Sequence, residues 1–132
     1  MIDLIEHVGI VVDNLDQAKA FAGQALGLQL VRENELPERG VKFAFYGAGG
    51  VQIEFIEPTR PDIREKRLGV PGTLARMEHL AVIVNRLDEA ESRLAGYGVV
   101  MQPRVKTPGR TWAMTDPQTS GGVIYQVVEL DS

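Results

Sequence analysis

The sequence predicts an α+β fold in which two tandem βαβββ modules share one β-sheet. Two internal matches lead to this prediction. The segment 7-HVGIVVDNLDQA-18 recurs as 79-HLAVIVNRLDEA-90, and 49-GGVQIEFIE-57 recurs as 121-GGVIYQVVE-129. Both matches have the same offset of 72 residues, which indicates an internal duplication. Because neither module can bury its sheet alone, we expect the two to pair about a pseudo-twofold axis.

The composition is that of one globular domain spanning residues 1–132. Hydrophobic residues make up 44% of the chain and charged residues 24%. A net charge of −4 offers no basic surface for nucleic acid, and the absence of cysteine excludes disulfides and thiolate metal sites. The apolar runs are too short to cross a membrane, and Met1 leads directly into a strand pattern. We therefore expect a cytoplasmic protein that binds neither nucleic acid nor membranes.

The first module covers about residues 1–57. Alternating residues over 4–13 predict a strand with His7 on one face and the even-numbered apolar residues, which pack on the helices, on the other. Asp13 is the expected N-cap of an amphipathic helix that Gly27 ends in a left-handed conformation. Strands are expected over 28–32, 41–46 and 51–56, with a loop over 34–40 and a glycine-rich hairpin turn before the last strand.

A charged connector over about 58–73 separates the modules and is expected to form one helical turn at 62–67. The second module, about 74–132, repeats the pattern: a strand over 74–84, a helix capped by Asn85 and ended by Gly96 or Gly98, and strands over 99–103, 111–115 and 123–128. The cations of the connector are interpreted as a solvated face, with an anionic substrate as the alternative contact: Arg60, Arg64, Lys66 and Arg67.

The chain contains only two histidines, His7 and His79, at the same position of the two modules. Strand parity places Glu54 on a face with its even-numbered neighbours, and the equivalent residue of the second module is Gln126. Two imidazoles, a carboxylate and an amide oxygen suit Zn, Ni, Co, Mn or Fe(II), with positions left open for water or substrate. We therefore predict a metal site formed by these four residues.

Each of these residues also has a plainer interpretation. A histidine in a strand is often a hydrogen-bonded core residue, and a glutamine in a final strand needs no special role. Glu57 and Glu129 also match by repeat, but their parity directs them away from the histidines, and we interpret them as surface residues at strand ends. Trp112 is either a pocket wall or part of the core.

Several motifs resemble the vicinal oxygen chelate superfamily, which includes glyoxalase I, methylmalonyl-CoA epimerase, extradiol dioxygenases and fosfomycin or bleomycin resistance proteins. These motifs are the His-x-x-x-x-V-x-x-L opening, the I-E-F run, the second His strand and the final D-P…G-G-V-x-x-Q segment. The resemblance implies a cupped mixed sheet with helices on its convex side. It also implies one divalent metal held at His7, Glu54, His79 and Gln126.

The stretch 35-ELPERGVKFAF-45 most resembles methylmalonyl-CoA epimerase, but the chain departs from that family at the site. The epimerases have Gln at the Glu54 position and Glu at the Gln126 position, so the two are exchanged here. Phe43 stands where bacterial epimerases carry a glutamate proposed as a second base. The His-His doublet of the epimerases is Glu78-His79 in this chain.

The resemblance implies a metal-dependent isomerase, epimerase or lyase that acts on a small carbonyl or acyl-thioester compound through a metal-stabilised enediolate. His7 and His79 would anchor the metal, Gln126 would be a neutral ligand, and Glu54 would be both ligand and catalytic base. An Fe(II) extradiol-type dioxygenase is an alternative, because two histidines and a carboxylate also form its facial triad. A second alternative is a non-catalytic protein that binds an antibiotic-like small molecule. A homodimer is expected.

Overall fold

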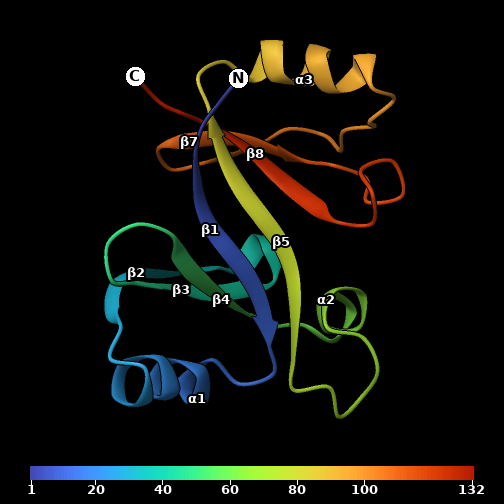
Figure 1. Cartoon of the computed structure of the whole chain (residues 1–132). Helices are drawn as coiled ribbons and strands as arrows, with labels where there is room; N and C mark the ends of the chain where they lie inside the picture. The colour runs from blue at the N-terminus through green and yellow to red at the C-terminus, as the bar shows by residue number, and fades with distance from the viewer. The chain divides into compact units, whose positions relative to one another are not determined.

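The computed structural model describes residues Met1–Ser132 and contains eight strands and three α-helices (Figure 1). The strands follow the order β2-β3-β4-β1-β5-β8-β7-β6 in one sheet. None of the helices has the length and apolar character that a membrane span requires. The strands are β1 (Ile2–Val12), β2 (Gln29–Leu36), β3 (Val41–Gly47), β4 (Gln52–Pro58), β5 (Ala75–Val84), β6 (Val105–Thr107), β7 (Arg110–Met114) and β8 (Ile124–Leu130), and the helices are α1 (Leu15–Ala20), α2 (Pro61–Arg67) and α3 (Leu87–Gly96).

The chain divides into two compact units. The first unit is Val8–Glu78, and the second unit combines Met1–His7 with His79–Ser132. Strands β1 and β5 are each divided between the two units, because one boundary follows His7 in β1 and the other precedes His79 in β5. The pairing of β5 with β8 is parallel, whereas β2–β3, β3–β4, β6–β7 and β7–β8 are antiparallel. This confirms the predicted α+β class with a mixed sheet, while the prediction of a single domain over residues 1–132 stays a prediction.

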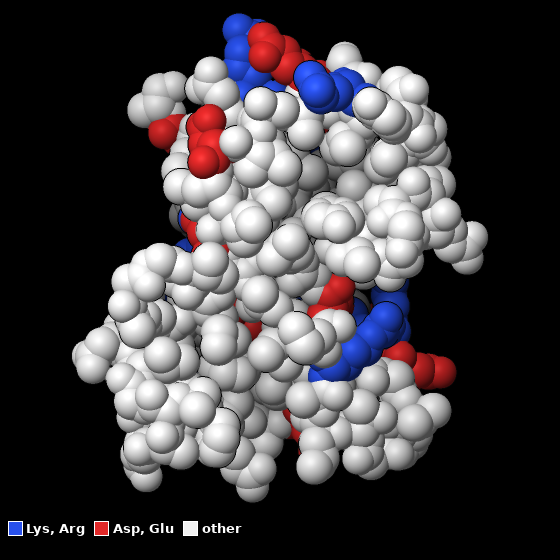
Figure 2. Space-filling model, viewed as in Figure 1, with Lys and Arg blue, Asp and Glu red and all other residues white.

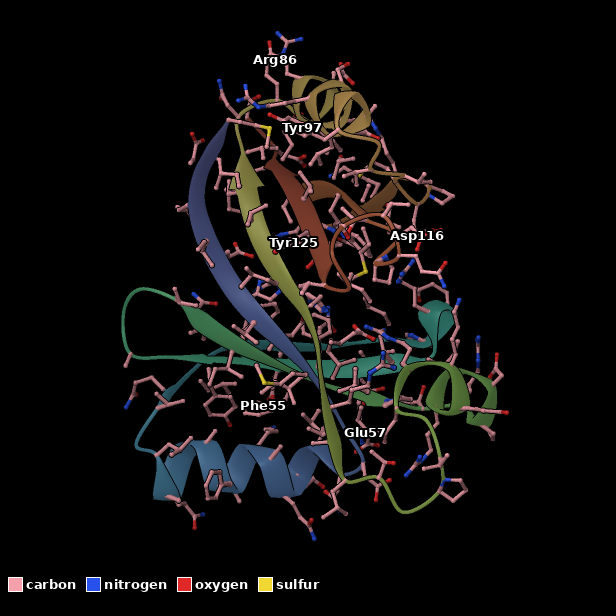
Figure 3. All side chains as sticks on the ribbon, turned by 45° about the vertical axis from the view of Figure 1, so that its right-hand side comes forward. Phe55, Glu57, Arg86, Tyr97, Asp116 and Tyr125 are labelled. Carbon is pink, nitrogen blue, oxygen red and sulfur yellow. The ribbon has the colours of Figure 1, made fainter.

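In the first unit, α1 packs on one face of its strands (Figure 1). Phe55 of β4 lies between the strands and α1 in Figure 3, and Ile53 packs against the same core. The odd-numbered residues of β4 therefore face α1, and Glu54 faces the other way, as strand parity predicts. The buried core residues of this unit are Val12, Leu15, Ala22, Ala44, Tyr46 and Phe55.

In the second unit, α3 covers β5 and β8 through a core of Val82, Val84, Leu87, Ala90 and Val127. The opposite face of these strands carries a smaller cluster of Ile83, Trp112 and Val128. Trp112 is 9% exposed, and its Nε1 donates to Thr107 Oγ1 at 3.1 Å. Trp112 thus belongs to the core of its own unit, which decides between the two interpretations left open by the sequence.

Two carboxylates close the N-termini of α1 and α3. The Leu15 N–H donates to Glu57 Oε1 at 2.7 Å, and the Leu87 N–H donates to Glu129 Oε1 at 2.7 Å. The donors and the acceptors are each 72 residues apart in the sequence, and Figure 3 shows Glu57 beside the start of α1. Helix N-termini have unpaired N–H groups and a positive dipole end, so a carboxylate stabilises them. The interpretation of Glu57 and Glu129 as surface residues is therefore wrong.

The helix ends differ from the predictions in their caps. Asn14, rather than Asp13, caps α1, with its Oδ1 accepting from the Gln17 N–H at 3.0 Å. Asp13 instead accepts from Arg64 at 2.6 Å. Gly27 adopts φ 71° after the π-helical turn that continues α1, and Gly98 adopts φ 81° after α3. Both glycines thus adopt the left-handed conformation expected beyond a helix.

Two strand predictions need correction. β2 runs to Leu36, so the loop expected over 34–40 shrinks to the short 3₁₀ turn Pro37–Arg39. The strand expected over 99–103 is absent, and only Met101 pairs there, in a single bridge to Thr115. Pro103 has no N–H for a ladder, and the chain resumes pairing later, in β6.

Replacing Glu129 by alanine should lower the free energy of unfolding by about 1–3 kcal/mol, because a half-buried hydrogen bond to a charged group is lost at the helix start. Urea denaturation measures this change. Glu65→Ala, which removes an exposed carboxylate from α2, is the matched control and should shift the midpoint little. Equal shifts in the two variants would contradict the capping role.

Candidate metal centre

The two histidines meet inside the second unit. β1 and β5 are neighbouring strands, and they bury His7 and His79 to 1% and 4% exposure. The Nε2 atoms of the two rings lie 3.3 Å apart, with the ring planes at 81°. Two nitrogens at about 2.0–2.1 Å from one ion, with a tetrahedral angle between them, are separated by roughly the same distance. The imidazole pair therefore fits two neighbouring positions around a metal such as zinc.

Gln126 lies in the same unit, on β8. In the parallel register of β5 and β8, His79 pairs with Ile124 and Ala81 pairs with Gln126, so His79 and Gln126 project from the same face. Gln126 is 7% exposed, and its Oε1 is buried with no hydrogen-bond partner. A buried acceptor without a partner is costly and rare in native proteins. A metal ion is one group that would satisfy such an amide oxygen.

Glu54 lies in the first unit, on the face of β4 turned away from α1. It pairs in register with Phe45 of β3, and Phe45 in turn pairs with Arg32 of β2. The guanidinium of Arg32 lies 4.1 Å from the centroid of the Phe45 ring, and the rings of Phe43 and Phe45 meet edge to face at 5.7 Å. Glu54 thus shares its face with two aromatic rings and one cation.

An acidic residue precedes each histidine. Glu6 Oε1 accepts from His7 Nδ1 at 2.8 Å and from Arg110 Nη1 at 2.7 Å, and Glu6 Oε2 accepts from Arg110 Nη2 at 3.1 Å. Burial raises the pKa of Glu6, but the hydrogen bonds from His7 and Arg110 and the charge of Arg110 outweigh it and lower the pKa to about 2. Glu6 is therefore ionised at neutral pH.

The carboxylate before the second histidine is held in a similar way. Glu78 accepts from Arg67 Nε at 2.9 Å and from Arg67 Nη2 at 2.6 Å. Burial lowers the pKa of the Arg67 guanidinium, but its hydrogen bond to Glu78 and the charges of Glu78 and Glu54 raise the pKa overall. The charge of Glu54 thus acts on the Arg67 side chain within the first unit.

Glu6 is not among the site residues predicted from the sequence. A signal was available, because the Glu-His doublet occurs at both 6–7 and 78–79. Arg110 had no such signal, since it is 104 residues from Glu6 in the chain and only the fold brings the two together.

The cations of the connector are mostly engaged in ion pairs. Arg60 pairs with Asp62, Arg64 with Asp13, and Arg67 with Glu78. Figure 2 shows blue and red atoms side by side over α2. The pairs of Arg60 and Arg64 are exposed and favour the interpretation of a solvated face, whereas the Arg67–Glu78 pair is largely buried.

His7, Glu54 and His79 each carry a side chain of a kind that binds metal ions. Two imidazole nitrogens and one carboxylate are typical ligands of zinc, iron and other first-row metals. Gln126 adds a neutral oxygen donor to this set. The side chains present therefore fit a divalent ion.

Comparison with known proteins identifies the family. A model of the glyoxalase/bleomycin resistance protein/dioxygenase superfamily matches residues 6–115. The chain belongs to this superfamily. The resemblance seen in the sequence is thereby confirmed, and the βαβββ pattern is the superfamily's fold.

Relatives of this superfamily member include proteins of known and unknown activity. The uncharacterized protein YqjC of Bacillus subtilis is 28% identical, over 95% of this chain and 91% of YqjC. The mitochondrial methylmalonyl-CoA epimerase of Bos taurus is 24% identical, over 93% of this chain and 72% of the bovine protein. The crystal structure of methylmalonyl-CoA epimerase from Mycobacterium tuberculosis is 27% identical and superimposes with a TM-score of 0.87, covering 99% of this chain and 90% of the other.

Gln126→Met should separate a structural role of this side chain from a ligand role. In chelator-treated protein the free energy of unfolding should stay equal or rise, because a buried acceptor without a partner, which costs about 1–3 kcal/mol, is removed. Metal affinity should fall in the same variant. Urea denaturation and Co²⁺ titration measure the two effects.

Gln102→Met is the control for Gln126→Met, because Gln102 is an exposed glutamine of the same unit. It should change neither quantity. Unaltered Co²⁺ affinity in Gln126→Met would show that the Gln126 amide oxygen is not a ligand.

Proposed function

We propose that the protein is a metal-dependent epimerase that removes and returns a proton at the carbon next to the thioester of a small acyl-coenzyme A. The observation that carries this proposal is the pair of buried Nε2 atoms of His7 and His79, 3.3 Å apart. The methylmalonyl-CoA epimerases among the relatives supply the reaction type and the substrate class. A cytoplasmic location and a homodimeric state remain predictions.

We assign the ion to His7, Glu54, His79 and Gln126, the same four residues that the sequence predicts. The histidines supply neutral nitrogen donors, Glu54 supplies the one negative charge, and Gln126 supplies a neutral oxygen. When bound, a divalent ion supplies Lewis-acid polarisation of the substrate carbonyl, which makes the neighbouring C–H more acidic. The identity of the ion, among Zn, Ni, Co, Mn and Fe, is left to metal analysis.

Glu54 is the residue that we assign as the base. It is the only carboxylate on its face of β3 and β4, because Glu57 faces α1. One oxygen of Glu54 would accept the proton from one face of the substrate carbon. Epimerisation then requires a proton to be delivered to the opposite face of the planar intermediate, from water or from a second acid. The guanidinium of Arg32 lies over the rings of Phe43 and Phe45 on this face, and its positive charge suits an anionic substrate.

Extradiol-type oxygenation is the second candidate, because two imidazoles and one carboxylate are also the ligands of the Fe(II) facial triad. Consumption of oxygen with a catechol by the Fe(II)-loaded protein, without proton exchange on an acyl-coenzyme A, would favour it. A small-molecule binding protein of the antibiotic-resistance type would show neither activity and would be stabilised by a drug-like ligand in a thermal screen.

Removal of the metal should lower the thermal stability of the wild-type protein. A ligand that binds only the folded state stabilises it by about 2.7 kcal/mol at a free concentration one hundred times its Kd. His7→Ala and His79→Ala should abolish binding, so chelator should not shift their melting temperatures. Elemental analysis checks the stoichiometry, and full metal occupancy in either variant would refute the ligand assignment.

Glu54→Gln should reduce exchange of the substrate α-proton with solvent deuterium by about 10²–10⁴-fold, the usual cost of losing a positioned base. NMR of methylmalonyl-CoA in deuterium oxide follows this exchange. Glu57→Gln changes a carboxylate on the other face of the same strand and is the control, with exchange expected close to wild type. Undiminished exchange in Glu54→Gln would assign the base to another residue.

A further inference from the structure

We propose that Glu6 and Arg110 are positioning residues that fix the tautomer and the orientation of His7, so that its Nε2 is presented to a divalent metal. This inference rests on the proposed metal site and extends it beyond the direct ligands. All three residues belong to the second unit.

The tautomer follows from the hydrogen bonds of Glu6. A carboxylate that accepts from both branches of a guanidinium fork is ionised and has no proton to donate. His7 Nδ1, at 2.8 Å from Glu6 Oε1, must therefore carry the hydrogen of that bond. A neutral imidazole carries one ring N–H, so His7 Nε2 holds a lone pair. This is the nitrogen that lies 3.3 Å from His79 Nε2.

The orientation follows from the bidentate contact with Arg110. Both oxygens of Glu6 are engaged by the Arg110 fork, which fixes the carboxylate plane. The Glu6 and Arg110 side chains are 18% and 16% exposed, so water screens the contact only in part. Arg110 itself stands on β7, which pairs with both β6 and β8. Through Glu6, the ring of His7 is therefore connected to β7, a strand with a paired neighbour on each side.

The arrangement is not a remnant of the duplication. Glu78, the repeat equivalent of Glu6, is held by Arg67 of α2, whereas Arg110 belongs to β7. The residue 72 positions before Arg110 is Glu38, which has the opposite charge. Each carboxylate beside a histidine has therefore acquired a guanidinium from a different, unrelated element. Carboxylates that accept from metal-bound histidines raise ligand basicity and fix ring orientation.

The test compares Glu6→Gln and Arg110→Lys with wild type in two measurements. Ring ¹⁵N chemical shifts of the two histidines in chelated protein report the tautomer, and Co²⁺ titration reports the metal affinity. Asp131→Asn is the matched control, because it removes a carboxylate of an exposed ion pair with Lys106 in the same unit. Far-UV circular dichroism and thermal melting check the fold of each variant.

We expect His7 to carry its hydrogen on Nδ1 in the wild type and to populate both tautomers in Glu6→Gln. Co²⁺ affinity should fall by about 10–100-fold in Glu6→Gln. It should fall less in Arg110→Lys, which keeps the charge but loses the fork, and it should be unchanged in Asp131→Asn. If Glu6→Gln does not fold, a shift of the His7 tautomer and a weaker Co²⁺ affinity in Arg110→Lys would support the proposal.

Two results would overturn the inference. One is a wild-type His7 with its hydrogen on Nε2, and the other is unaltered Co²⁺ affinity in a folded Glu6→Gln variant. If the wild type itself binds no Co²⁺, the proposed function fails. The histidine tautomers would still show whether Glu6 controls His7, so the two failures are distinguishable.

Discussion

The approach of two imidazoles, His7 and His79, is the constraint on which the rest of this structure depends. Burying two polar rings is costly unless their nitrogens have partners. The fold meets this demand on one side with the Glu6 carboxylate, which accepts from His7 Nδ1 at 2.8 Å. On the other side the two Nε2 atoms converge to 3.3 Å. Neighbouring central strands, β1 and β5, are required for this convergence.

Helices α1 and α3 pack on the strands that carry the two histidines. They cover the faces of β1 and β5 that carry even-numbered apolar residues, so the two histidines lie on the faces turned away from these helices. The carboxylates of Glu57 and Glu129 hold the starts of both helices with the same 2.7 Å hydrogen bond. The start of the helix is therefore held by the same hydrogen bond in the two modules.

The chemistry of the two modules is not alike. Glu54 in one module corresponds to Gln126 in the other, so only one of the two carries a negative charge. The carboxylates before the histidines are held by Arg110 in one case and Arg67 in the other, from unrelated elements. The two modules therefore share a scaffold but differ in the charged side chains that it carries.

The duplication and the period-two alternation of apolar residues were sufficient to predict the fold class, the direction in which Glu54 faces and the shared position of the two histidines. These features depend on local pattern, and a strand has only two faces. Two predictions from the sequence were wrong. Asn14, rather than Asp13, caps α1, while Asp13 accepts from Arg64, 51 positions away, which no local pattern reveals. The expected strand over 99–103 did not form, apart from a single bridge at Met101.

By itself, the sequence was enough to predict a duplicated α+β fold that resembles this superfamily, and the residue types of a metal site. Only the tertiary structure showed that the histidine Nε2 atoms meet, that Gln126 Oε1 is buried without a partner, and that Arg110 holds Glu6 against His7. The reason is physical. Strand patterns specify which face a side chain occupies, whereas a hydrogen bond between residues 104 positions apart exists only after the strands have paired.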